Sequence, residues 1–243
     1  MLGSSVWAGD LSDRLQEFPH WQSPPKGTVA KGELIYPDWF EGSWRATSIL
    51  REAIAPLAPE IITPGFEQNQ DSIGEPVIFT VRFTDDIMPV PIKGMKGITE
   101  LNRNRQPKGI VADRVFNSKS LGNAALGAGF VESVQLDPNN FSRLTTEFNN
   151  GQQLISESRE RATETYDREF ISSEMFQQTF RSHSQLYLNQ VENTTDYRLT
   201  QDHPKKIEAN QITAIYLSPK DPDFFKARNR PVALYQYDLV LEK

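Results

Sequence analysis

The stretch Tyr36-Pro37-Asp38-Trp39-Phe40-Glu41-Gly42-Ser43-Trp44 decides the fold of this chain of 243 residues. It places a Gly-x-Trp step directly before a run of alternating side chains that starts at Trp44. Glycine permits the sharp bend by which a chain crosses the bottom of a barrel. A Trp two residues later can plug that end with its large apolar surface. The stretch therefore predicts the entrance strand of a β-barrel.

Strand patterns continue from this entrance to the end of the chain. Residues 44–50 alternate with the period of a half-buried strand, and so do residues 77–83, whose Val/Phe face must be buried. Asn149-Asn150-Gly151 is a strong hairpin signal. Further strands are predicted at residues 110–116, 133–136, 143–148, 152–165, 169–181, 185–199, 211–217 and 232–241. About eight to ten antiparallel strands in consecutive hairpins favour an all-β, up-and-down barrel, because closure removes the exposed edges of an open sheet.

An arm precedes the barrel. Leu11, Leu15 and Phe18 have the spacing of a short amphipathic helix over residues 10–18. The proline-rich segment that follows favours an extended chain, which Trp21 pins against the body. Residues 1–32 are therefore predicted as an N-terminal arm and residues 33–243 as a single barrel domain. Within that domain, 85–109 is predicted as an irregular connection, and 120–129 as a short helix with a glycine stop or a loop of small residues.

Composition argues against several kinds of function. The net charge of −6 and the pI near 5.2 argue against a general nucleic-acid binder, which needs a basic surface. The absence of cysteine removes disulfides, thiolate catalysis and zinc-thiolate sites. The three histidines, His20, His183 and His203, include no pair at metal-ligand spacing, so no metal site is predicted. No apolar run approaches the length of a membrane span.

The Gly42-x-Trp44 step resembles the opening signature of lipocalins and related calycins. This resemblance implies a lipocalin-like or calycin-like barrel that contains a small apolar or amphipathic molecule. It implies a container and does not specify a reaction.

Longer motifs resemble a family of cyanobacterial and chloroplast proteins of the thylakoid-lumen type. The shared elements are residues 36–44, the Pro-Leu-Ala-Pro loop at 56–59, the Thr-Pro-Gly-Phe element at 63–66, and segments at 176–178, 187–189 and 213–219. The resemblance covers most of the chain from Leu15 onward. It implies a protein of oxygenic phototrophs that is delivered to the thylakoid lumen or the periplasm. Val6-Trp7-Ala8 has the pattern of a signal-peptidase site, which favours a trimmed export signal, although an accidental Ala in a disordered start is the alternative.

Aromatic and arginine side chains on the strands are the candidate ligand contacts. An inward Arg binds a carboxylate or carbonyl through its planar fork, and Tyr hydroxyls orient a polar group. Aromatic rings either line an apolar cavity or fill a solid core. The candidates are Trp44, Phe79, Phe83, Arg82, Arg114, Tyr187, Tyr216, Tyr235 and Tyr237. With the resemblance, they favour a non-enzymatic protein that binds a pigment, a tetrapyrrole or a lipid, or that assists the assembly of a photosynthetic membrane complex.

An enzyme of the calycin type, such as a bilin lyase or a pigment-modifying enzyme, is the alternative. It needs convergent polar groups inside the barrel, and the candidates are Glu157, Arg159, Arg161 and Tyr187. Alternation places the first three on one side of their strand, where cross-strand ion pairs on a solvated face are the simpler interpretation.

Contact with a protein partner is a third hypothesis. Proline-rich segments are already extended and lose little entropy on docking. The residues predicted to make such contacts are Trp21, Pro56, Pro59 and Phe66.

Overall fold

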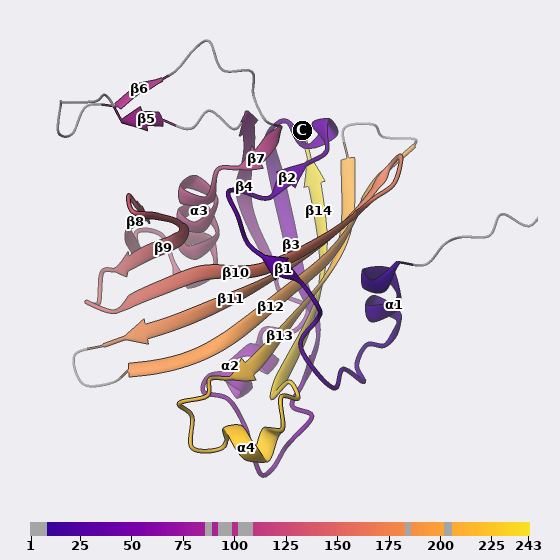
Figure 1. The fold of residues 1–243 in the computed structure, drawn as a ribbon, viewed down its shortest axis with the longest axis vertical. Helices are drawn as coiled ribbons and strands as arrows, with labels where there is room; N and C mark the ends of the chain where they lie inside the picture. The colour runs from indigo at the N-terminus through magenta and orange to yellow at the C-terminus, as the bar shows by residue number, and fades with distance from the viewer. Residues whose placement is uncertain (1–8, 86–88, 92–98, 102–108, 183–185, 202–205) are drawn as a thin grey trace, which may run out of the picture.

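The computed structural model describes residues 9–85, 89–91, 99–101, 109–182, 186–201 and 206–243. One antiparallel sheet forms most of this part and curls into a half-barrel (Figure 1). Its strands are β1 (Thr28–Val29), β2 (Ile35–Tyr36), β3 (Gly42–Ile54), β4 (Pro76–Asp85), β7 (Ile110–Ala112), β8 (Val131–Asp137), β9 (Asn140–Phe148), β10 (Gln153–Thr165), β11 (Glu169–Arg181), β12 (Leu186–Leu199), β13 (Lys206–Leu217) and β14 (Ala233–Glu242). A separate hairpin pairs β5 (Pro89–Pro91) with β6 (Thr99–Leu101).

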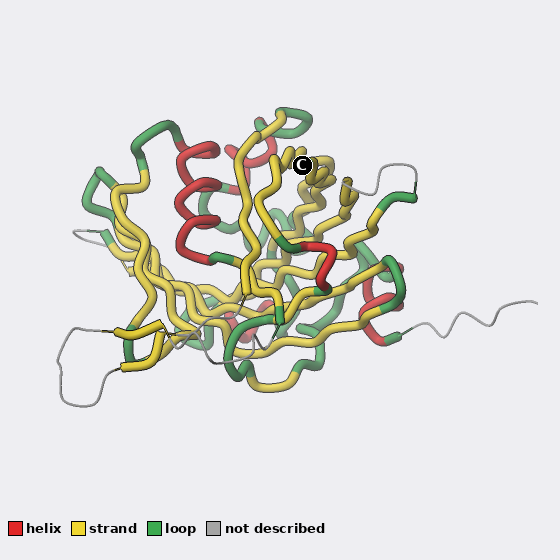
Figure 2. Tube along the Cα trace, turned by 90° about the horizontal axis from the view of Figure 1, so that it is seen from above, coloured by secondary structure: helices red, strands yellow, loops and turns green. Residues whose placement is uncertain are grey.

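Apart from α3, the helices are short. They are α1 (Asp10–Gln16), the 3-10 helix η1 (Asp38–Phe40), α2 (Phe66–Asp71), α3 (Arg114–Leu126) and α4 (Phe224–Ala227). α1 packs against β10 and β11 from outside the curl, whereas α3 sits inside it (Figure 2). The helix at 10–18 is thus confirmed, with its last turn shorter than expected.

The strand order confirms the all-β antiparallel barrel expected from the sequence. Neighbours in the sheet follow the order β2-β7-β4-β3-β14-β13-β12-β11-β10-β9-β8, and β1 pairs with β10. From β8 to β14 each strand pairs with the next strand of the chain, as in an up-and-down barrel. β14 pairs with β3, so the first long strand and the last strand of the chain lie side by side.

Helix α3 fills the gap that the strands leave open. Among the described residues β4 and β8 do not pair with each other, and α3 packs against both. Asn117 and Ser120 accept hydrogen bonds from backbone N–H groups of β4 at 2.7 and 3.0 Å. Asn123 accepts one from β8 at 2.9 Å, and Lys119 donates to a β8 carbonyl at 3.0 Å. The helix thereby satisfies backbone groups at both sheet edges that would otherwise invite pairing with another chain.

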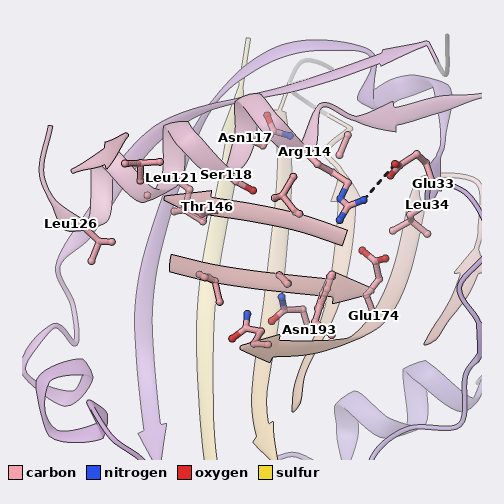
Figure 3. Close-up of a pocket in the computed structure, with 18 of the residues that line it drawn as sticks. Glu33, Leu34, Arg114, Asn117, Ser118, Leu121, Leu126, Thr146, Glu174 and Asn193 are labelled. Atoms are coloured by element: carbon pink, nitrogen blue, oxygen red, sulfur yellow. Dashed lines mark hydrogen bonds and ion pairs between the residues drawn. The ribbon is translucent and has the colours of Figure 1, made fainter. Parts of the chain in front are cut away.

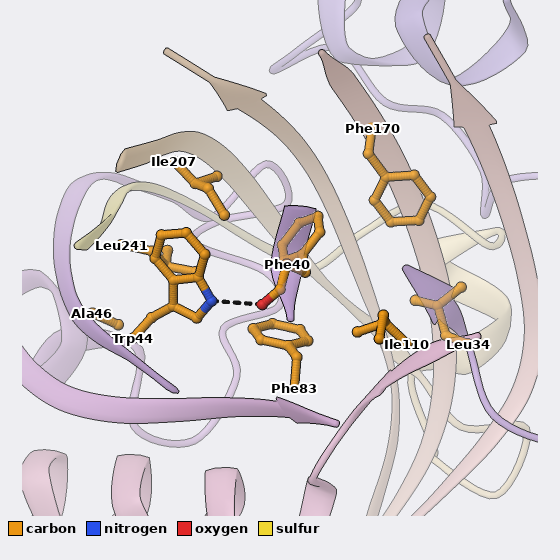
Figure 4. Packing of buried hydrophobic residues seen from close by; sticks show 9 residues of the cluster. All are labelled: Leu34, Phe40, Trp44, Ala46, Phe83, Ile110, Phe170, Ile207 and Leu241. Atoms are coloured by element: carbon orange, nitrogen blue, oxygen red, sulfur yellow. Dashed lines mark hydrogen bonds between the residues drawn. The ribbon is translucent and has the colours of Figure 1, made fainter. Parts of the chain in front are cut away.

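Aromatic side chains close one end of the half-barrel, as the Gly-x-Trp step predicts (Figure 4). Trp44 is 1 % exposed, and its indole N–H donates to the carbonyl oxygen of Phe40 at 2.6 Å. The rings of Phe83 and Phe170 pack against Phe40 with centroid distances of 4.9 and 6.0 Å. Gly42 has a φ of +104°, a conformation that glycine adopts without strain, so the bend before Trp44 depends on it.

A buried ion pair fixes the N-terminal arm to the outer face of the sheet. Arg14 donates to both carboxylate oxygens of Glu192, at 2.6 and 2.7 Å, and Glu192 is fully buried. The Arg14 guanidinium lies 3.9 Å from the centre of the Trp21 ring, and the Trp21 indole N–H donates to the Arg14 carbonyl at 2.8 Å. Trp21 therefore pins the arm, as expected.

Two boundaries near α3 were predicted wrongly. The strand expected over 110–116 ends at Ala112, because the Asp113 carboxylate accepts a hydrogen bond from the backbone N–H of Phe116 and caps the start of α3. Of the two alternatives for 120–129, the helix with a glycine stop is confirmed, since α3 ends at Leu126 with Gly127 as its C-cap; only the start of this helix was predicted too late.

Other differences lie at the ends of strands. The strand expected from residue 211 already begins at Lys206. β1 brings residues 28–29 of the predicted arm into the sheet through its pairing with β10. The connection expected over 85–109 is described only in part, and the candidate signal-peptidase site at 6–8, His183 and His203 lie outside the described residues.

Candidate functional site

A cavity of about 430 Å³ lies between α3 and the inner face of β8 to β12 (Figure 3). Side chains alternate along a strand, so Glu174, Phe176 and Gln178 of β11 all point into it. Apolar side chains form much of its wall: Leu121 and Leu126 of α3, and Leu144, Phe148, Leu154 and Phe176 of the strands. The interior near α3 is thus hollow, in contrast to the packed plug around Trp44.

A glycine allows α3 to approach the sheet at this point. A Cβ atom at Gly122 would lie 2.5 Å from Cγ2 of Val131 on β8, closer than two carbon atoms pack. The helix is 13 residues long, yet it has no buried residue. It therefore covers the cavity as a roof, held at the sheet edges by polar contacts, and is not part of a packed core.

The first charged pair at the cavity joins Glu33 and Arg114. Oε1 of Glu33 lies 3.4 Å from Nη1 of Arg114, the first residue of α3. Arg114 also donates to the carbonyl oxygens of Phe141 and Ser142, at 2.7 and 3.2 Å. Burial raises the pKa of Glu33, and the neighbouring Arg114 only partly opposes this effect. Arg114 is therefore held in place by three acceptors, one carboxylate oxygen and two backbone carbonyl oxygens. It faces a carboxyl group that is costly to ionise.

The second charged pair joins Arg161 and Glu174, whose Nη2 and Oε1 atoms are 3.0 Å apart. The Ser158 hydroxyl donates to the same carboxylate oxygen at 3.1 Å. In the described part of the chain, the Nε–H of Arg161 is buried and has no hydrogen-bond acceptor. Glu33, Arg114 and Glu174 lie together at one end of the cavity, and Leu126 lies at the other (Figure 3).

The cavity therefore has an apolar part and a charged part. Two guanidinium groups and two carboxyl groups meet around the charged end, next to the hydroxyl of Tyr36, whose pKa burial raises well above its usual value. Such an end offers both donors and acceptors to a polar group of a ligand. Among the described residues, no cluster of His, Asp and Glu side chains is arranged to hold a metal ion.

Seven of the nine predicted ligand residues lie on the interior side of the sheet, in three groups. Arg114 lines the cavity. Trp44 and Phe83 are buried in the aromatic plug, with Phe79 packed against it. Tyr235 and Tyr237 face the interior near Phe66, and Tyr187 faces it from β12, where its hydroxyl is buried and, within the described residues, without a hydrogen-bond partner.

Arg82 and Tyr216 do not point into the interior, so their prediction as ligand contacts is corrected. Arg82 lies between two inward residues of β4, and it pairs with Asp113 of the helix cap at 2.5 Å. Tyr216 lies on the outer face of β13, where its hydroxyl donates to Glu192 at 2.8 Å beneath the N-terminal arm. Alternation separates the two faces of a strand, but it does not predict which face lines the interior of the barrel.

Of the four residues predicted to contact a protein partner, two are buried and two are exposed. Trp21 and Phe66 are 2 % and 6 % exposed, so their side chains contact the barrel and are not available to a partner. Pro56 and Pro59 are exposed on the loop between β3 and α2.

A β-bulge rearranges the candidate enzyme residues. The pairing of β10 with β11 shifts between Ser158 and Glu160, and the extra residue turns Arg161 to the inner face. Glu157 and Arg159 remain outside, where they form an ion pair at 2.7 Å. The expectation that all three share one side is wrong for Arg161, while the ion-pair interpretation holds for the other two.

Sequence reasoning missed Glu33, Tyr36 and Glu174 as residues of the site. Glu33 and Tyr36 belong to the segment that crosses from β10 to β7, whose pairing partners are far away in the chain. Glu174 lies in a strand with a regular pattern, and only its cavity neighbours distinguish it. Alternation on β11 was the one available signal, since it groups Glu174 with Phe176 and Gln178.

Fold and site define a class: an antiparallel β half-barrel with a helix-covered internal cavity that is charged at one end. The chain belongs to the family described as Domain of unknown function (DUF6816), whose model matches residues 28–243. No curated protein and no solved structure matches the chain. Within the described residues, no helix combines the length and the apolar character needed to cross a membrane.

Proposed function

We propose that the protein binds an amphipathic small molecule in the cavity beneath α3. The observation that carries this proposal is the division of one cavity into an apolar wall and a charged end formed by Glu33, Arg114 and Glu174. An apolar group of the ligand lies against Leu121, Leu126 and the strand residues, and its polar group lies at the charged end. Most small-molecule sites combine these features, with a few placed polar groups in an apolar pocket.

The size of the cavity supports a ligand of moderate length. Its volume of about 430 Å³ falls within the range of roughly 300–1,000 Å³ that is typical of ligand pockets. Leu121 and Leu126 line the cavity and are also 43 % and 55 % exposed, so the apolar wall continues to the surface. A longer ligand therefore extends out of the cavity along α3.

The charged end favours a ligand that both accepts and donates hydrogen bonds. Arg114 supplies donors for a carboxylate or carbonyl, and the carboxyl group of Glu33 or Glu174 accepts from an N–H or hydroxyl group. A tetrapyrrole, with pyrrole N–H groups and acidic side chains, combines both. A pigment or a lipid with a polar head fits the same description. An origin in oxygenic phototrophs, a location in the thylakoid lumen or periplasm, and a role beside a photosynthetic membrane complex are part of this proposal.

Titration of the full chain with two probes tests it. One probe is biliverdin, a tetrapyrrole, followed by its absorption; the other is a fatty acid with a fluorescent label. The variant Thr146→Phe places a ring inside the cavity, because Thr146 lines it. Its matched control is Thr145→Phe, one residue earlier on β9 and on the opposite face. We expect the parent and the control to bind at least one probe with the same dissociation constant, and Thr146→Phe to weaken it at least tenfold.

Two results would overturn the proposal. If neither probe binds the parent protein at micromolar concentration, the cavity does not serve this ligand class. If Thr146→Phe binds as tightly as Thr145→Phe while both unfold at the temperature of the parent, the ligand lies elsewhere.

A further inference from the structure

The loop between β13 and β14 exposes an aromatic side chain to solvent. Phe225 of α4 is 84 % exposed, more than any other large hydrophobic side chain among the described residues. The loop itself is firmly packed: Ala227 and Val232 are 1 % and 0 % exposed and contact Leu57 and Ile61 of the loop after β3. The exposure of Phe225 is therefore imposed by a fixed scaffold, and docking of this ring on an apolar surface removes its area from water.

Positive charge is concentrated around this ring. We call residues 220–230 the basic loop, because its charged residues are four cations, Lys220, Lys226, Arg228 and Arg230, and two aspartates, Asp221 and Asp223. One aspartate is already engaged, since Asp223 pairs with Lys226 at 2.5 Å. The whole chain carries a net charge of −6, so this loop has the opposite sign to the protein that presents it.

The basic loop lies at the end of the half-barrel opposite the aromatic plug. α4 is at the opposite end of the molecule from η1 and the start of β3, where the aromatic plug sits (Figure 1). The end of β13 and the start of β14 carry the loop, and they pair with residues near the start of β12 and the end of β3. Two further exposed apolar residues belong to this end: Leu186, at the start of β12, is 60 % exposed, and Ile62, in the loop after β3, is 47 % exposed.

We propose that the end of the half-barrel opposite the aromatic plug docks onto an anionic lipid bilayer through Phe225 and the basic loop. An exposed aromatic ring next to cations suits the boundary of a bilayer, where the ring enters the acyl region and the cations remain beside anionic head groups. The positive loop is attracted to any anionic surface, and a bilayer also offers an acyl region in which the Phe225 ring is removed from water. The inference goes beyond ligand binding and stands without it.

Sedimentation of the full chain with vesicles tests this surface. The vesicles contain either phosphatidylcholine alone or phosphatidylcholine with an equal amount of phosphatidylglycerol. We expect binding only to the anionic vesicles, and weaker binding at 0.5 M salt because salt screens the charges. Phe225→Ser should lower the partition coefficient roughly tenfold, since it removes the ring that enters the acyl region of the bilayer. Lys220→Glu reverses one charge and should lower it about thirtyfold.

Matched controls change the same residue types elsewhere. Val29→Ser alters an apolar side chain that is 70 % exposed on β1, and Lys31→Glu reverses an exposed charge in the segment after it. Both should bind as the parent does. The inference is overturned if the parent does not sediment with anionic vesicles, or if Phe225→Ser and Val29→Ser bind equally. It is also overturned if the parent forms a dimer without lipid that Phe225→Ser dissolves, because a second copy then covers the ring.

Discussion

Replacing Arg14 by Leu removes the guanidinium that holds the N-terminal arm on the sheet. The partner carboxylate, Glu192, is fully buried, and the Arg14 side chain is only 10 % exposed. The hydroxyl groups of Tyr216 and Thr194 also donate to Glu192, each at 2.8 Å, and remain in the variant. They are neutral donors. Among the described residues, Arg14 is the one cation that donates a hydrogen bond to the Glu192 carboxylate, so the variant leaves this buried negative charge without a cationic partner.

The size of the effect follows from this burial. Breaking a buried ion pair by removing one partner costs about 3–5 kcal/mol, because the remaining charge is left uncompensated in a low dielectric. For a chain of this length, that loss lowers the unfolding temperature by about 6–20 °C. The arm also loses the cation–π contact of Arg14 with Trp21, where the guanidinium lies 3.9 Å from the ring centre.

Urea unfolding, followed by tryptophan fluorescence, measures the free energy of unfolding. The control is Arg51→Leu: Arg51 and Asp238 are 2.7 Å apart, but both side chains are 49 % exposed. Exposed pairs contribute at most about 1 kcal/mol. The double variant Arg14→Leu with Glu192→Leu should recover most of the loss, since apolar side chains replace a buried pair at little cost. The reasoning is refuted if Arg14→Leu and Arg51→Leu destabilise the protein equally.

Two further predictions concern α3 and pH. Gly122→Ala should lower the free energy of unfolding by about 1–3 kcal/mol, because its methyl group meets Val131 at 2.5 Å and this overpacking outweighs the better helix propensity of alanine; equal or greater stability in urea unfolding would contradict it. Burial raises the pKa of Asp196 to about 6, against the opposing effect of Arg198, so the folded state holds a proton that the unfolded chain releases near pH 4. The free energy of unfolding should therefore fall as the pH rises from about 4 to 6. Asp196→Asn should be more stable than the parent at pH 8, by on the order of 1–3 kcal/mol, and equally stable at pH 3. The same difference between variant and parent at both pH values would count against this.

The strands were predictable because alternation is a local property. β11 was expected at residues 169–181 and occupies Glu169–Arg181. The Gly-x-Trp step also predicted the plug, since the bend at Gly42 and the indole of Trp44 need no knowledge of distant partners. Both signals lie within a few residues of the feature that they predict.

The site was harder to predict because it depends on pairing between distant strands. The bulge after Ser158 has no signature in the sequence, yet it moves Arg161 from the outer to the inner face. Tyr216 was assigned to the interior because it is aromatic and lies on a predicted strand, but the arm buries it on the outer face. The sequence indicates that an apolar side chain is covered, but the segment that covers it is determined by the tertiary structure.

The cavity exists because a helix and not a strand occupies the gap between β4 and β8. A strand there would send every second side chain into the interior and bond the sheet edges through its backbone. α3 instead bonds those edges through Asn117, Ser120 and Asn123 and buries none of its residues, so the space beneath it stays open. The aromatic plug and the arm contribute to the stability of the fold from positions away from the cavity. It follows that binding and stability should separate: Thr146→Phe should remove binding at little cost in stability, and Arg14→Leu should do the reverse.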